Sequence, residues 1–159
     1  MFLSKYFPFP GLVNDMMSIL QTMFPVALEE FCSRYSIKAE GMAGGQFNGL
    51  NCKRVLEFLE DLGLLLGPSG DGCVKYLQAL KDVHHLCVQK ELNPNFQLII
   101  DCWKKEFDQM QSKHNMSMTL KSHNWYWHLQ EFLASAEGVE ATHSKYKTVG
   151  KRNGADTNI

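Results

Sequence analysis

The chain has 159 residues, of which 45% are hydrophobic and 21% are charged, a composition typical of one ordinary globular domain. Its formal net charge of -1 and sequence pI near 6.6 exclude the strongly basic footprint that announces nucleic-acid binding by itself. Binding of that kind therefore has to come from local patches.

The N-terminus, MFLSKYFPFPGLV, is apolar but is broken by Pro8 and Pro10, so we do not expect a signal peptide. No segment reaches the length needed to span a bilayer, and we expect no membrane partner. The five cysteines form no C-x-x-C pair, which favours reduced, buried thiols in an intracellular protein.

The first helical pattern extends from Asn14, a predicted N-cap, to Tyr35. Pro25 interrupts it, which predicts two short helices or one kinked helix. A glycine-bearing loop is expected at 37–51. No strand is expected, except at the extreme N-terminus.

Four further patterns follow the loop. The residues Val55 to Leu62 predict a helix that is ended by Gly63 and the turn-rich GPSGDG at 67–72. Two long amphipathic helices are expected next, the first beginning after Gly72 and the second capped by Asn95, and they should pack antiparallel. The last pattern is an apolar stripe typical of another helix, made by Trp125, Leu129, Phe132 and Leu133.

These patterns predict an all-α fold, a single irregular helical bundle of about five to six helices. The helical domain is expected over residues 1–146. Residues 147–159 lack apolar periodicity and are expected to form a flexible tail.

The stretch GGQFNGLNCK places Gly44 and Gly49 at the spacing of a phosphate-binding loop. Leu50 and Asn51 occupy the positions where such a loop needs Lys and Ser or Thr. Without the lysine that meets the phosphates or the hydroxyl that meets magnesium, we do not expect nucleotide binding here.

The histidines offer weak metal patterns. His84 and Cys87 share a helix face and could ligate zinc, but that face is the apolar stripe, which favours a packed core histidine beside His85. His123 and His128 are five apart rather than four, and no HExxH motif is present. Their roles stay open.

The aromatic run Trp125, Tyr126 and Trp127 could stack nucleic-acid bases. Trp125 falls on the core stripe, so only Tyr126 or Trp127 is expected to be free for stacking. Partial burial of both is the structural alternative.

Glu137, Glu140 and His143 recur at spacings of three, which on a helix presents two carboxylates and an imidazole together. Such ligands suit magnesium or manganese. A solvated helix surface explains the same pattern.

Three stretches together are similar to parts of DDE-type transposases encoded by animal mobile elements. AGGQFNGLNCKRVLEFL resembles their H-G-G-x-F-x-G-N-x-C-R-x-L-L segment, MTLKSHNWYWHLQEFL resembles T-P-K-x-H with its following helix, and SAEGVEATHSKY resembles S-E-Q-x-x-E-S-x-H-x-x-F. The resemblance covers residues 37–146.

The matched positions are Gly44, Gly45, Phe47, Gly49 and Cys52 in the first motif, Thr119, Lys121 and His123 in the second, and Glu137, Glu140, His143 and Tyr146 in the third. Ala43 and Leu120 replace the usual histidine and proline. Leu50 displaces the usual asparagine to Asn51.

The resemblance implies that the glycines form a turn into a helix and that Glu140 is the last acidic metal ligand. Two aspartates on a ribonuclease-H-like sheet would complete that centre with two divalent metals. The segment before Ile37 is too short for such strands, and Asp15 has a helical context. We therefore expect a catalytically incomplete fragment rather than an enzyme.

The expected function is residual weak DNA binding. The protein is expected to be intracellular, and nuclear if it binds DNA. The positions for phosphate contact are Lys113, Lys121, Lys145, Lys147, Lys151 and Arg152, for which a solvated surface is the alternative. A helical protein-interaction domain with another protein chain as partner stays open. An active magnesium- or manganese-dependent nuclease is the third hypothesis.

Overall fold

The computed structural model describes residues 9–40, 46–47 and 49–135. They form seven α-helices, one 3₁₀ turn and one pair of two-residue strands. The predicted all-α fold is confirmed, with more helices than expected. The predicted tail at 147–159 lies outside these ranges.

The elements follow one another closely along the chain. In order they are α2 (Phe9–Met23), α3 (Pro25–Arg34), β1 (Ala39–Glu40), β2 (Gln46–Phe47), α4 (Gly49–Glu57), α5 (Leu59–Leu66), η1 (Pro68–Gly70), α6 (Asp71–Val88), α7 (Phe96–His114) and α8 (Leu120–Ala134).

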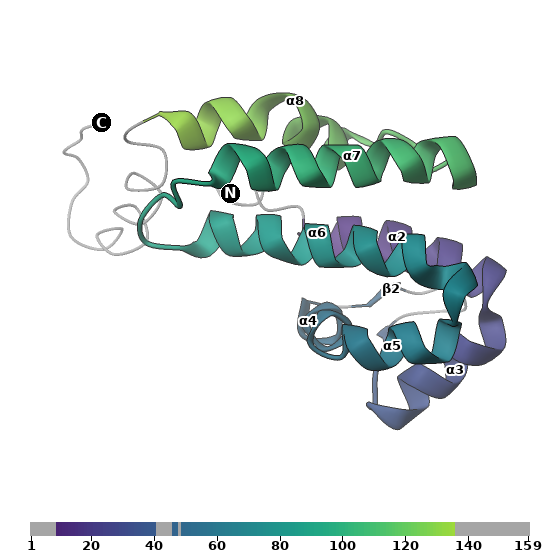
Figure 1. The fold of residues 1–159 in the computed structure, drawn as a ribbon. Helices are drawn as coiled ribbons and strands as arrows, with labels where there is room; N and C mark the ends of the chain where they lie inside the picture. Colours follow the sequence, from purple (N-terminus) through teal and green to yellow (C-terminus); the bar gives the residue numbers. More distant parts are fainter. Residues whose placement is uncertain (1–8, 41–45, 48, 136–159) are drawn as a thin grey trace.

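The helices form three tiers (Figure 1). Helices α7 and α8 lie side by side along one edge, α6 runs antiparallel to α7 with α2 packed against it, and α3, α4 and α5 form the opposite edge. The antiparallel pairing of the two long helices is confirmed. Since α6 contacts elements of both edges, it is the central helix of the bundle.

The helix is interrupted at Phe24, so of the two predicted alternatives the structure has two separate helices, α2 and α3. Pro25 begins α3 and Phe24 has φ of -136° and ψ of 57°. Proline lacks an N–H and disfavours the helical conformation of the residue before it. The break follows from these two local effects.

The prediction that Asn14 caps a helix was wrong, because α2 begins at Phe9 and Asn14 lies inside it. Its amide nitrogen donates to the Pro10 carbonyl at 2.8 Å and to the Phe47 carbonyl at 2.9 Å. Its oxygen accepts from the Phe47 N–H at 2.8 Å. The buried amide therefore attaches β2 to α2 through both backbone groups of Phe47.

The short strands flank the loop that carries the glycines. Ala39 pairs with Phe47 and Glu40 with Gln46, antiparallel, which corrects the expectation that this segment holds no strand. Cys52 is fully buried beside Phe47, and burial raises the pKa of its thiol to about 11. The thiol therefore stays neutral, with the Phe47 carbonyl 3.6 Å from its sulfur.

The predicted end of the helix over Val55 to Leu62 is partly right: it ends at the start of GPSGDG, but Gly63 lies inside it. The helix is interrupted earlier, at Phe58, and the next helix, α5, continues through Gly63 to Leu66. A glycine inside a helix costs only about 1 kcal/mol relative to alanine. The true terminator is Gly67, whose φ of 75° favours glycine.

The core between α6, α7 and α8 contains the largest buried side chains, among them Trp103, Trp125, Tyr76 and Phe107. The rings of Trp103 and Trp125 meet edge to face at 5.8 Å and 78°, a favourable arrangement for aromatic pairs. Ile100, Trp103, Phe107 and Met110 confirm the predicted stripe of α7. Leu129 and Leu133 do so for α8.

The predicted cap of α7 is only partly right. Asn95 precedes the helix, but its side chain makes no capping bond; instead its N–H donates to the Asn93 side-chain oxygen at 2.8 Å. At α8 the helix start is set by a reciprocal capping box between Thr119 and Ser122.

Substitution of Asn14 by alanine should lower the free energy of unfolding by about 2–3 kcal/mol, because it leaves backbone groups of Phe47 without their partner. Urea unfolding measures this effect. The control is Asn95→Ala, an exposed residue without a side-chain capping bond, for which we expect a change within about 0.5 kcal/mol. Equal effects of the two substitutions would contradict the role of Asn14.

Gly67→Ala should destabilise the protein by about 1–3 kcal/mol, because φ of 75° with ψ of -172° is a backbone conformation that essentially only glycine adopts. A Cβ at Gly67 meets no atom within 4 Å, so the cost would come from the backbone alone. Gly49→Ala is the matched control: it also meets nothing within 4 Å and should be neutral or stabilising by up to about 1 kcal/mol. Thermal unfolding of both variants checks the difference.

Candidate functional site

The predicted metal and catalytic residues Glu137, Glu140 and His143 follow α8 and lie outside the described residues. The same holds for four of the six basic candidates, which are Lys145, Lys147, Lys151 and Arg152. Their roles stay predictions.

The other two basic candidates belong to different helices. Lys113 is exposed in the last turn of α7, where a cation meets the negative end of the helix dipole. Lys121 is exposed near the start of α8, and its side chain lies so close over Gly11 that a Cβ there would collide with it. Its charge also lowers the pKa of Asp15, which burial raises more strongly.

The three consecutive aromatic residues of α8 have different environments. Trp125 is fully buried, as predicted, whereas Trp127 is 57% exposed. Tyr126 is half-buried between them, and its hydroxyl donates to the Asp108 carboxylate at 2.9 Å. Of the two side chains predicted to be free for stacking, Trp127 is the accessible one.

Trp127 contacts Tyr126, which in turn lies under a lysine of α7. Its ring lies 4.9 Å from that of Tyr126, and the Lys104 ammonium lies 5.2 Å from the Tyr126 ring centroid. The rings of His123 and His128 are 5.4 Å apart. We call Lys104, His123, Tyr126, Trp127 and His128 the α8 aromatic surface.

Sequence reasoning missed the contribution of Lys104, because it comes from the neighbouring helix. The only local signal was that Lys104 and Asp108 are four apart and so share a face of α7. Their position opposite Tyr126 depends on how α7 packs against α8. That packing is a tertiary property.

The zinc hypothesis for His84 and Cys87 finds no support. Burial, assisted by His85 and Lys53, lowers the pKa of His84 to about 4, and burial raises the pKa of the Cys87 thiol. Among residues 9–40, 46–47 and 49–135 no group of three or more His, Cys, Asp or Glu side chains could hold a metal ion. His84 is a half-buried, neutral histidine at the core boundary.

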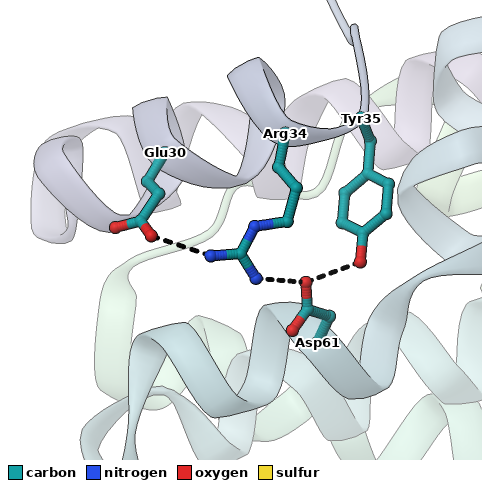
Figure 2. Close-up of polar contacts among 4 residues, drawn as sticks. All are labelled: Glu30, Arg34, Tyr35 and Asp61. Atoms are coloured by element: carbon teal, nitrogen blue, oxygen red, sulfur yellow. Dashed lines mark hydrogen bonds and ion pairs between the residues drawn. The ribbon is translucent and has the colours of Figure 1, made fainter.

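A polar cluster that the sequence did not reveal joins α3 to α5 (Figure 2). Asp61 accepts from the Arg34 guanidinium at 2.8 Å and from the Tyr35 hydroxyl at 2.6 Å. Arg34 also binds Glu30 at 2.8 Å. The i,i+4 pair of Glu30 and Arg34 is readable from sequence, but Asp61 is not.

An aromatic stack packs against the same cluster. The Tyr35 ring lies 4.0 Å from the Phe58 ring at an interplanar angle of 10°. Arg54 donates to the Ser36 carbonyl at 3.2 Å, just after the end of α3. Arg34, Tyr35 and Asp61 bond to one another across two helices, which is typical of a structural contact rather than of a reactive site.

Comparisons with known proteins matched no protein-family model, no curated protein and no solved structure. The resemblance to transposases therefore stays a prediction from the quoted motifs. No helix within the described ranges is both long and apolar enough to cross a membrane.

Tyr35→Phe should raise the pKa of Asp61, because the Tyr35 hydrogen bond is the largest cause of its depression, followed by that of Arg34. A depressed carboxyl pKa stabilises the fold above the unfolded value of about 3.9 and stops doing so as the pH falls through the folded value. The stability difference between wild type and variant should therefore be full at pH 7 and shrink in acid.

An NMR titration of the Asp61 carboxyl and urea unfolding at several pH values measure these effects. Tyr126→Phe, which deletes a tyrosine hydroxyl elsewhere, is the control and should leave the Asp61 titration unchanged. An unchanged Asp61 pKa in Tyr35→Phe would contradict the assignment.

Proposed function

We propose that this chain is a helical, catalytically incomplete portion of a transposase-like protein that binds nucleic acid weakly through the α8 aromatic surface. The observation that carries the proposal is the 57% exposure of Trp127 beside Tyr126 and Lys104. Stacking of a base on an accessible ring, next to cations that meet the phosphates, is how single strands are bound without sequence preference. The three quoted sequence motifs are the second support.

The charge of the chain sets the strength of this binding. A net charge of -1 gives little general attraction to phosphates, so the salt dependence should reflect only a few contacts. His123 and His128 add positive charge only when protonated. The proposed site therefore has low affinity, and stacking supplies most of the free energy of binding.

Glu137, Glu140 and His143 would supply carboxylate and imidazole ligands if magnesium or manganese binds. We assign no reaction step to them. Under this proposal the chain acts inside the cell, and in the nucleus where the nucleic acid is DNA.

The second candidate function is a protein-interaction domain without a nucleic-acid role. Leu120 is 76% exposed and is seven residues from Trp127, so the two lie on one outward face of α8. Exposed apolar residues on one helix face are typical of helix-mediated contacts. Concentration-dependent association in sedimentation velocity, abolished by Leu120→Lys, would favour this function.

The decisive experiment titrates the full chain with fluorescein-labelled single-stranded DNA at two salt concentrations, with magnesium or EDTA. Trp127→Ala should weaken binding by about fivefold or more, since stacking is worth about 1–3 kcal/mol per base. Leu98→Ala removes another exposed apolar side chain, on α7, and should change nothing. Glu140→Ala should also bind like the wild type.

Intrinsic fluorescence gives an independent readout, because Trp103 and Trp125 are fully buried. Quenching on DNA addition should therefore come from Trp127 and should vanish in Trp127→Phe. Absence of binding at low salt would contradict the proposal and favour the interaction domain. Metal-dependent DNA cleavage that is lost in Glu140→Ala would favour the nuclease hypothesis instead.

A further inference from the structure

Two histidines on the exposed side of α8 lie against each other. The rings of His123 and His128 have a centroid distance of 5.4 Å and an interplanar angle of 67°, and both residues are exposed. Positions five apart lie roughly 140° apart around a helix axis, so the two side chains converge to bring the rings this close. They form a pair of accessible imidazoles.

Trp127 belongs to the same part of the α8 surface. It follows His123 by four residues, which makes the two side chains neighbours on the helix, and it directly precedes His128. Its side chain is 57% exposed. An accessible aromatic ring therefore lies beside two groups that become cationic when they take up a proton.

The closeness of the two imidazoles links their protonation to the binding of an anion. A protonated imidazole carries a positive charge and has N–H donors only. Two such cations at this separation repel each other. An anion that contacts both rings offsets the repulsion and accepts from their N–H groups, so proton uptake and anion binding favour each other.

One carboxylate of α8 lies beside the pair. An oxygen of Glu131 is 4.0 Å from Nδ1 of His128, and the Glu131 side chain is 82% exposed. An exposed ion pair of this kind contributes little free energy, and rotation of the Glu131 side chain leaves the His128 ring accessible. Glu131 therefore weakens the binding of an anion without blocking it.

The helices packed against α8 bring charges of both signs. On α7, Asp108 accepts from the Tyr126 hydroxyl and the Lys104 ammonium lies 5.2 Å from the Tyr126 ring centroid. Toward α2, the charge of Lys121 acts on Asp15, whose pKa is raised by burial. The titration of Asp15 has to be separated from that of the histidines by experiment.

We propose that His123 and His128 form a proton-dependent phosphate subsite of the α8 aromatic surface. The pair contacts the sugar–phosphate backbone of a single strand while a base stacks on Trp127. This inference rests on the proposed function and adds to it the groups that meet the phosphate. Phosphate contacts carry no sequence information, in agreement with stacking that has no sequence preference.

The test is a titration of the full chain with rhodamine-labelled oligothymidylate at about pH 5.5, 6.5 and 7.5, which spans the range where histidine changes charge. The ionic strength is held constant. We expect the affinity of the wild type to rise about fivefold or more from the highest to the lowest pH, because binding takes up protons. In the double variant His123→Gln, His128→Gln the rise should be less than about twofold.

Two further variants are the controls. His85→Gln removes another exposed histidine, on α6, and should keep the pH dependence of the wild type. Trp127→Ala should bind more weakly at every pH but with the same relative rise, since it keeps both histidines. A pH dependence that comes from Asp15 would persist in the double histidine variant.

Calorimetric titration in two buffers of different ionisation enthalpy measures the protons taken up on binding. The wild type should take up protons near pH 6.5, and the double histidine variant should not. Wild-type binding that is equal at the three pH values, or a pH dependence that the double variant retains, would overturn the subsite and leave the proposed function standing. Absence of binding at every pH would overturn both.

Discussion

The side-chain amide of Asn14 is the contact on which the arrangement of the N-terminal half depends. It pairs with both the N–H and the C=O of Phe47, as a neighbouring strand would, and so replaces a strand that the chain does not have at this position. The strand pair β1–β2 contains only two residues on each side, too few to be stable alone. The amide therefore fixes the segment that leads into α4, and with it the position of α4 against α2.

The rest of the bundle is organised around α6. This helix contacts α7 on one side and α4 and α5 on the other, so the aromatic core and the smaller N-terminal group share it. The aromatic core consists mainly of apolar side chains but contains two buried polar atoms, one of Tyr76 and one of Trp103. At the opposite edge of the bundle, Arg34 and Tyr35 bond to Asp61 and so join α3 to α5. Apolar patterning alone would allow the helices to pack in more than one way. Specific polar contacts select one arrangement.

The surface features relate differently to the two functional proposals. The α8 aromatic surface has one accessible ring and few nearby charges, which suits weak stacking of bases. The same exposed face carries Leu120, which suits contact with a protein. The two proposals use the same surface of α8 but differ in chemistry. Base stacking requires the aromatic rings, whereas an apolar protein contact requires the whole helix face that carries Leu120 and Trp127. The acidic residues that the transposase resemblance emphasises follow α8 in the chain, outside the described part.

The sequence by itself determined the fold class, the antiparallel pairing of α6 with α7, the break at Pro25 and the burial of Trp125. These follow from apolar periodicity and proline chemistry, which act over a few residues. It misassigned Asn14 and Gly63, because both residues are common at helix ends and only their surroundings show that they lie inside helices. Phe47, the partner of Asn14, is 33 positions away. Only the tertiary structure decided that Lys104 approaches Tyr126, that Asp61 meets Arg34 and that Tyr76 and Trp103 share one region, since each pairing depends on how separate helices pack.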